Sequence, residues 1–84
     1  MRIGLKLFAS LAGYLPAEAR ASHRIDLDVD PGTTVVDLIR RHGFPEALCA
    51  IVLADGHWVA RPDRATRALS EGQVLAMWPP VAGG

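Results

Sequence analysis

Residues 30–45 read DPGTTVVDLIRRHGFP, and this stretch predicts the main helix of the chain. Thr34 and Asp37 have the spacing of a capping box, in which each side chain accepts a hydrogen bond from a free backbone N–H at the helix start. Gly43 supplies a left-handed residue after the last turn, and Pro45 prevents the helix from continuing. The helical spacing predicts a core-facing stripe that comprises Val35, Leu38, Ile39 and His42.

Strand-like runs flank this helix on both sides. Apolar and polar residues alternate before it, which is typical of strands with one buried face, and an Asp55-Gly56 pair predicts a tight hairpin after it. The last run is apolar on both faces, as in a strand that is covered twice, or covered once and presented to a partner. The expected strands comprise residues 2–8, 24–29, 50–54, 57–59 and 74–78, and short helical turns are expected within 9–15 and 61–69.

One long helix cannot cover both faces of such a sheet. The expected fold is therefore α+β, with a mixed sheet of four to five strands, the main helix on one face and the other face partly open. A chain of 84 residues has room for one small domain with a modest core. We place this domain at residues 1–78 and an extended tail at residues 79–84.

The composition excludes several classes of partner and compartment. Nine basic residues balance nine acidic ones, so charge gives no reason to expect nucleic acid or an anionic membrane as a partner. Cys49 is the single cysteine, which excludes an intramolecular disulfide and favours a reducing compartment. The sequence also shows no signal peptide and no apolar run of transmembrane length, and we expect a cytoplasmic protein.

The tail reads PPVAGG over residues 79–84. Two prolines have fixed φ angles and no backbone N–H, so they predict a stiff, extended exit from the last strand. Two glycines without a Cβ allow the end to enter a channel that other residues would block. A frayed terminus can also be glycine-rich. The direct succession of apolar strand, rigid prolines and glycine end favours a functional tail.

Four stretches together resemble the MoaD/ThiS family of ubiquitin-like sulfur carriers, which share the β-grasp fold. They are the helix entry over residues 32–39, the Asp55-Gly56 hairpin, the turn over residues 69–72 and the tail. Within this family the Pro-Pro tail and the segment 9–23 look most like the small subunit of molybdopterin synthase.

The resemblance implies a chemistry centred on Gly84. An E1-like adenylyltransferase would join the Gly84 carboxylate to AMP from ATP, and sulfur would then replace AMP to give a thiocarboxylate. Gly83 would let the end reach both active sites. The large subunit of molybdopterin synthase, in a heterotetramer, would receive a tail that also contains Pro79, Pro80, Val81 and Ala82. The chain itself would be a non-catalytic carrier without a bound cofactor, and ATP would be used by the activating enzyme.

The tail needs help from the globular body to bind a partner. Ordering residues 81–84 costs about 4–8 kcal/mol, and glycines offer little contact area in return. An apolar docking surface on the open sheet face would supply the missing affinity. The candidates are Phe8, Trp58, Met77 and Trp78. The alternative for each of them is that it simply belongs to the core.

Other functions remain open at this point. The same carrier chemistry serves thiamine, tRNA thiolation, cysteine or tungsten-cofactor routes. A ubiquitin-like modifier would instead conjugate Gly84 to protein lysines. An interaction module would need no chemistry at its glycine end.

Three further groups of residues have weaker claims as sites. Cys49 lies in an apolar stretch that favours a buried small residue over a sulfur-relay thiol. The three histidines, His23, His42 and His57, lack metal-ligand spacing and are expected at the surface or at a helix end. The arginines Arg61, Arg64 and Arg67 form a mild basic cluster that could steer an acidic partner, but we favour a solvated loop as their explanation.

Overall fold

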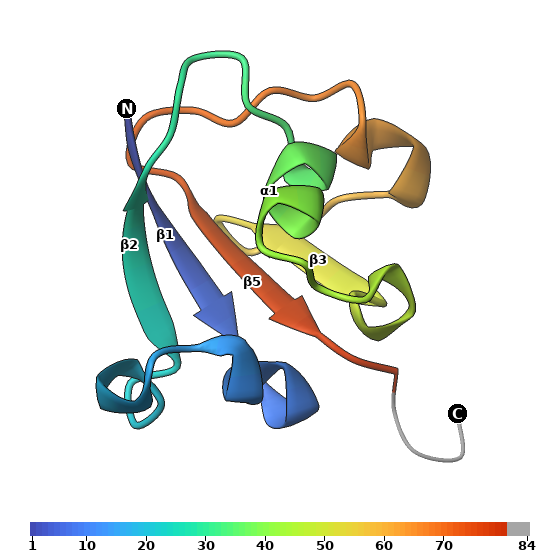
Figure 1. The fold of residues 1–84 in the computed structure, drawn as a ribbon. Coiled ribbons are helices and arrows are strands. Elements are labelled where there is room, and N and C mark those ends of the chain that lie inside the picture. The colour runs from blue at the N-terminus through green and yellow to red at the C-terminus, as the bar shows by residue number, and fades with distance from the viewer. Residues whose placement is uncertain (81–84) are drawn as a thin grey trace.

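A five-stranded sheet organises the computed structural model, which describes residues 1–80 (Figure 1). The strands are β1 (Arg2–Leu7), β2 (Arg24–Asp28), β3 (Ile51–Ala54), β4 (His57–Trp58) and β5 (Val74–Trp78). One α-helix, α1 (Val35–Arg41), lies within these residues, together with the 3-10 helices η1 (Ala9–Tyr14), η2 (Ala17–Ala19), η3 (Glu46–Leu48) and η4 (Arg61–Arg64). The predicted fold class is confirmed.

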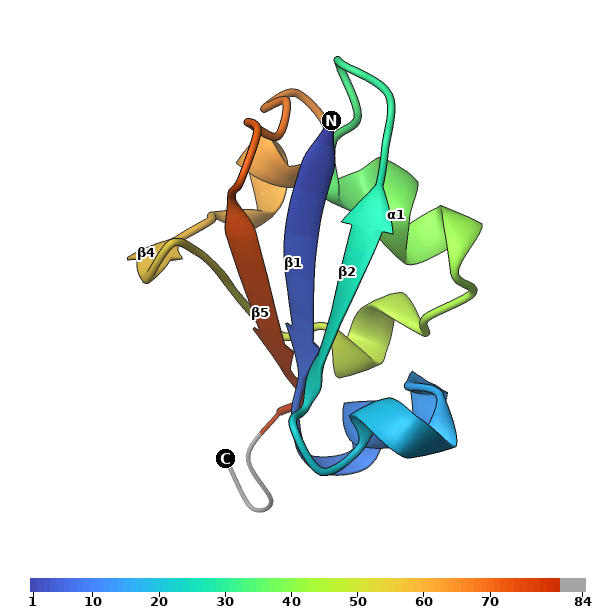
Figure 2. The ribbon, with the colours of Figure 1, turned by 90° about the vertical axis from the view of Figure 1, so that its left-hand side faces the viewer.

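The sheet is mixed, and its order is β2-β1-β5-β3-β4. β5 pairs with β1 in parallel, and the other three pairings are antiparallel. β5 is therefore a central strand with a neighbour on each side, as its continuous apolar sequence indicated. In Figures 1 and 2, α1 lies on one side of the sheet formed by β1, β2 and β5, and the opposite side carries no helix that overlies these strands.

The core fills the space between the sheet and α1. Alternation along β1 buries Leu5 and Leu7, each with no exposed surface, and β5 contributes Leu75 in the same way. From α1 the predicted stripe supplies Val35, Leu38 and Ile39, all at most 2% exposed. The place of His42 in the core-facing stripe is wrong, because this residue is the exposed C-cap of α1, as expected of a histidine at a helix end, and its ring nitrogen contacts the Leu38 carbonyl oxygen at 3.0 Å.

Both ends of α1 follow the predicted local chemistry. The Thr34 N–H donates to Asp37 Oδ2 at 2.9 Å, and the Asp37 N–H donates to Thr34 Oγ1 at 3.2 Å, which completes the capping box. The bond from the Thr34 backbone holds the pKa of Asp37 below its usual value, and the Thr34 hydroxyl adds to this effect. After the helix, Gly43 adopts a φ of 70°, which a residue without a Cβ reaches most easily.

The hairpin between β3 and β4 also follows its prediction. Asp55 and Gly56 have φ angles of 48° and 83°, the left-handed values that tight two-residue turns require. The Asp55 carboxylate accepts a hydrogen bond from the Val74 N–H at 2.8 Å, and the Asp55 N–H donates to the Val74 carbonyl oxygen at 2.8 Å. The turn is thus tied to the first residue of β5.

Candidate functional site

The tail begins where the central strand ends. Trp78 pairs with Ile51 of β3 as the last residue of β5, and the half-buried Pro79 and exposed Pro80 follow it. Proline has no N–H for a sheet ladder, so the pairing stops at this point. The remaining tail residues, for which insertion into a partner and thiocarboxylate formation are predicted, lie outside the described residues; they are Val81, Ala82, Gly83 and Gly84.

A hollow of about 720 Å³ adjoins the root of the tail. Its walls come from the start of η1, the end of η3, the first residue of β3 and the two prolines, and it is lined by Ala9, Ser10, Leu48, Ile51, Trp78, Pro79 and Pro80. Most of these side chains are apolar. A partner that bound the tail would therefore contact an apolar surface where the tail begins.

Trp78 belongs to a stack of three rings. Phe8 lies between Trp78 and His23, with ring centroids 4.5 Å and 5.1 Å away and planes inclined by 6° and 18°. The His23 ring nitrogen Nδ1 contacts the Leu7 carbonyl oxygen at 3.2 Å. This stack fixes the orientation of Trp78 directly before the prolines. His23 was not identified from the sequence, because only the pairing of β1 with both β2 and β5 brings the three residues together.

The open sheet face carries a second hollow, of about 340 Å³. Cross-strand pairing places Trp58, Leu53, Ala76 and Lys6 in one row across four strands, because paired residues share a face of the sheet. The hollow lies over this row and is lined by Lys6, Phe8, Leu53, Asp55, Gly56, Val74, Ala76 and Trp78. This surface, which we call the open-face hollow, is the candidate docking site.

The four predicted docking residues have different surroundings. Trp58 is 55% exposed, and Phe8 and Trp78 are half-buried at the edge of the open-face hollow. These three are accessible to a partner, and their role in docking stays a prediction. Met77 is wrong as a member of an exposed surface, because it is completely buried. It faces the helix side of β5, opposite to Trp78, since successive side chains of a strand point to opposite faces.

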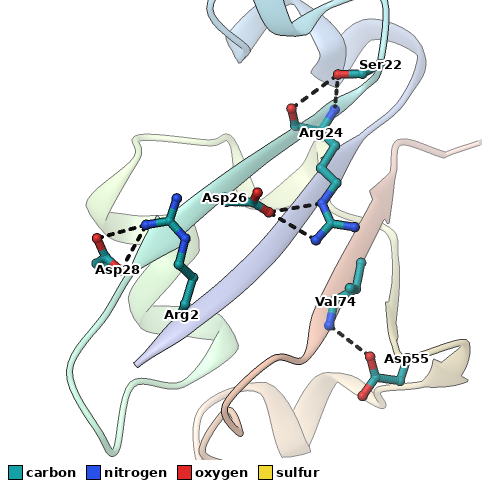
Figure 3. Close-up of polar contacts among 7 residues, drawn as sticks. All are labelled: Arg2, Ser22, Arg24, Asp26, Asp28, Asp55 and Val74. Atoms are coloured by element: carbon teal, nitrogen blue, oxygen red, sulfur yellow. Dashed lines mark hydrogen bonds and ion pairs between the residues drawn. The ribbon is translucent and has the colours of Figure 1, made fainter.

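A polar band borders the open face along β2 (Figure 3). Arg24 reaches across β1, and its Nε and Nη2 atoms both lie 3.0 Å from Asp26 Oδ1. A Cβ on Gly4 would stand 2.7 Å from Arg24 Nη2, so glycine at this position lets the guanidinium lie flat over β1. Lys6 belongs to none of the three ion pairs found among residues 1–80.

The weaker candidates have structural explanations. Cys49 is fully buried, and burial raises the pKa of its thiol, which disfavours the reactive thiolate. The prediction of a solvated loop is wrong for Arg64, which is only 4% exposed and donates to the Cys49 and Ala50 carbonyl oxygens at 2.6 Å and 3.1 Å. Residues 1–80 contain no group of three potential metal ligands. Over the same range no helix has the length and apolarity needed to cross a membrane.

Comparison with known proteins identifies the family of the chain. The sequence model of the ThiS family matches residues 14–84. No curated protein matches the sequence significantly.

Solved structures show the same fold. SAMP1 of Haloferax volcanii, also titled small archaeal modifier protein 1, is 30% identical over the full length of both chains, with a TM-score of 0.66. A further Haloferax volcanii protein is 29% identical, with a TM-score of 0.74 over this whole chain and 87% of the other. Molybdopterin-converting factor from Helicobacter pylori, solved as a complex of its subunits 1 and 2, contains a chain that is 16% identical over the full length of both chains, with a TM-score of 0.59. That likeness concerns the fold alone.

Proposed function

This chain belongs to the ThiS family, and we propose that it is a sulfur carrier whose Gly84 carboxylate is converted into a thiocarboxylate. The observation that carries the proposal is the origin of the tail. The tail continues β5, a central strand, and it leaves the sheet at Trp78, whose ring is held by a stack of aromatic side chains. A tail with a rigid origin is suited to delivering one reactive end to the active sites of two different enzymes.

The chemistry proceeds in two substitutions. A Gly84 carboxylate oxygen attacks the α-phosphorus of ATP, and pyrophosphate leaves, so that a poor acyl donor becomes an acyl adenylate. Sulfur delivered as hydrosulfide then attacks the acyl carbon, AMP leaves with the bonding electron pair, and loss of the S–H proton gives the thiocarboxylate. The activating enzyme supplies the phosphate-binding and acid–base groups. The carrier supplies a free Gly84 carboxylate and the surface that positions it, and it is not itself a catalyst.

The open-face hollow is proposed as the docking site for the E1-like adenylyltransferase. Its apolar residues Leu53, Val74 and Ala76 remain partly accessible in the centre of the sheet, where Trp58 adds an exposed ring at one end. Burial of such a surface in a complex contributes about 25 cal/mol per Å². That contribution offsets the cost of ordering the tail, about 4–8 kcal/mol for four residues.

For the receiving pathway we propose molybdenum cofactor biosynthesis, with this chain as the small subunit of molybdopterin synthase. Support comes from the Pro79-Pro80 pair and from the segment that forms η1 and η2, both of which resemble that branch of the family. The Helicobacter pylori structure is titled as a complex of two subunits, which fits a large subunit as the second partner.

Intact-mass spectrometry tests the carrier chemistry. The chain is incubated with the cognate E1-like enzyme, ATP and a sulfur source, and the expected product has one oxygen of Gly84 replaced by sulfur. Reactions without ATP and with a chain that lacks Gly84 are the controls, and neither should change in mass. An unmodified Gly84 in the complete reaction would refute the proposal. Transfer of the sulfur to a cyclic pterin precursor by the large subunit tests the pathway separately.

A second candidate function is protein modification. The identity to SAMP1, titled a small archaeal modifier protein, reaches 30% over the whole chain, which is higher than the identity to the molybdopterin-converting factor. In that case an amine would attack the Gly84 adenylate or a later acyl intermediate, and an isopeptide bond would form. Lysine adducts of higher mass in the same reaction would favour the modifier. Lys6 is the only lysine of the chain, so self-conjugation through a lysine side chain has a single possible acceptor.

A further inference from the structure

A small hollow of about 150 Å³ lies between α1, η3 and η4, apart from the tail and the open-face hollow. Its apolar wall comes from α1, and its charged wall comes from η3 and η4. The lining residues are Val36, Ile39, Glu46, Arg61 and Arg64. The proposed sulfur chemistry makes no use of the two arginines that share this site.

Arg64 is the unusual member. It is 4% exposed, and its two hydrogen bonds go to neutral acceptors, the Cys49 and Ala50 carbonyl oxygens. Its Nε atom is buried and has no partner among the described residues. No carboxylate of residues 1–80 lies within ion-pair distance of it. A buried guanidinium without an anionic partner is costly, because the carbonyl dipoles offset only part of its lost hydration.

The neighbours leave the hollow positively charged. Arg61 adds a second guanidinium. Burial lowers the pKa of Arg64, and the charge of Arg61 adds to this effect. Glu46 is the only carboxylate in the lining, and it is shared, because its Oε1 lies 3.9 Å from Arg40 Nε. The lining therefore holds two guanidinium groups and one carboxylate, and that carboxylate also lies near Arg40 outside the lining.

We propose that this hollow is a binding site for a small oxyanion of the phosphate type. Guanidinium groups recognise tetrahedral oxyanions well, because their planar N–H donors match the oxygen edges. A volume of about 150 Å³ is sufficient for a single phosphoryl group. A bound anion would neutralise Arg61 and Arg64 and thereby strengthen the connection that Arg64 makes between η4 and the start of β3.

Thermal unfolding of the isolated protein tests the site with inorganic phosphate as the probe, against chloride at the same ionic strength. A dissociation constant on the order of 5 mM would raise the ratio of folded to unfolded protein about fivefold at about 20 mM phosphate. For a domain of this size that corresponds to a rise in Tm of about 4–8 °C. Because this ratio grows as one plus the phosphate concentration divided by the dissociation constant, the Tm should keep rising with the logarithm of the phosphate concentration above that constant.

Two variants separate a site from a general salt effect. Arg61→Gln removes one cation from an exposed position and should abolish the rise in Tm over the chloride control while leaving the fold intact. Arg67→Gln removes an exposed arginine that does not line the hollow, and it should keep the full rise. No rise in Tm over the chloride control in the unmodified protein, or an equal rise in both variants, would overturn the proposal.

Backbone amide shifts give a second readout and distinguish the source of the phosphoryl group. Inorganic phosphate should shift the amides of residues 61–64 and of Glu46 in a saturable way, and the Arg61→Gln variant should lose this response. Titration with AMP distinguishes a free anion from a phosphate monoester. An equal response to AMP assigns the site to phosphoryl groups in general, and a response to phosphate alone assigns it to the free ion. Saturable shifts confined to other residues would contradict the assignment.

Discussion

The stack of Phe8 on Trp78 predicts a measurable coupling between the two residues. Their centroids lie 4.5 Å apart and their planes are inclined by 6°, a geometry in which an aromatic pair contributes about 0.5–1.5 kcal/mol beyond the area that it buries. Because both rings are half-buried, each single substitution to alanine should lower the free energy of unfolding by about 1.5–2.5 kcal/mol, roughly half the loss for a fully buried aromatic residue. The double variant should lose less than the sum of the two, by about 1 kcal/mol.

Urea unfolding followed by far-ultraviolet circular dichroism measures this coupling, because the signal does not depend on the tryptophan that is removed. The slope of the free energy against urea should stay the same in all variants, so that the midpoints can be compared. A cycle of Phe8→Ala with Trp58→Ala is the matched control, since Trp58 takes no part in the stack. A Phe8–Trp78 coupling no larger than that of the control pair would refute the idea that the stack holds Trp78 in place.

The remaining predictions concern the sheet face, the helix cap and the cysteine. Trp58→Ala should raise the KM of the carrier in the adenylation reaction about thirtyfold, as expected for an interface tryptophan that contributes about 2 kcal/mol, and should leave the melting temperature nearly unchanged. Met77→Ala should instead lower the free energy of unfolding by about 2–5 kcal/mol. The reverse pattern would contradict the assignment of the two faces. The Asp37 pKa is lower in the folded protein than its ordinary value of 3.8, so its contribution to stability is present above that pH and is lost as the pH falls through the folded pKa. Asp37→Asn should therefore lower stability at neutral pH but not in strong acid, which unfolding curves across the acidic range will measure, and a difference that persists in acid would exclude the capping carboxylate as its cause. Buried Cys49 should react with a thiol reagent only when the protein unfolds. A labelling rate that is fast in the native protein and does not depend on urea would show that Cys49 is accessible.

Local patterns in the sequence predicted the elements whose chemistry is local. The capping box of Thr34 and Asp37, the left-handed Gly43 and the Asp55-Gly56 turn each depend on residues at most a few positions apart, and all are present. The alternation in β1 likewise identified its buried face. These features follow from backbone geometry and do not depend on the rest of the fold.

The failures share a different cause. Met77 and Trp78 are both apolar, so the pattern of β5 could not tell which of them faces α1. Arg64 is buried because two carbonyl oxygens near the start of β3 accept its donors, and arginine in a polar loop gives no sign of this. The stack of Phe8 and His23 with Trp78 requires strands that are distant in the sequence to pair. Each of these properties is decided by tertiary contacts.

The parallel pairing of β1 with β5 also bears on when the open-face hollow forms during folding. It joins residues 4–7 to residues 74–77, and β5 is synthesised after every other strand. Contacts this distant in the sequence form late in folding, since the long intervening loop must first be closed. The open-face hollow needs residues from β1, β3 and β5 at once. On the proposal that the open-face hollow docks the activating enzyme, a nascent or partly unfolded chain would offer that enzyme no complete surface, and its recognition would select for fully folded molecules.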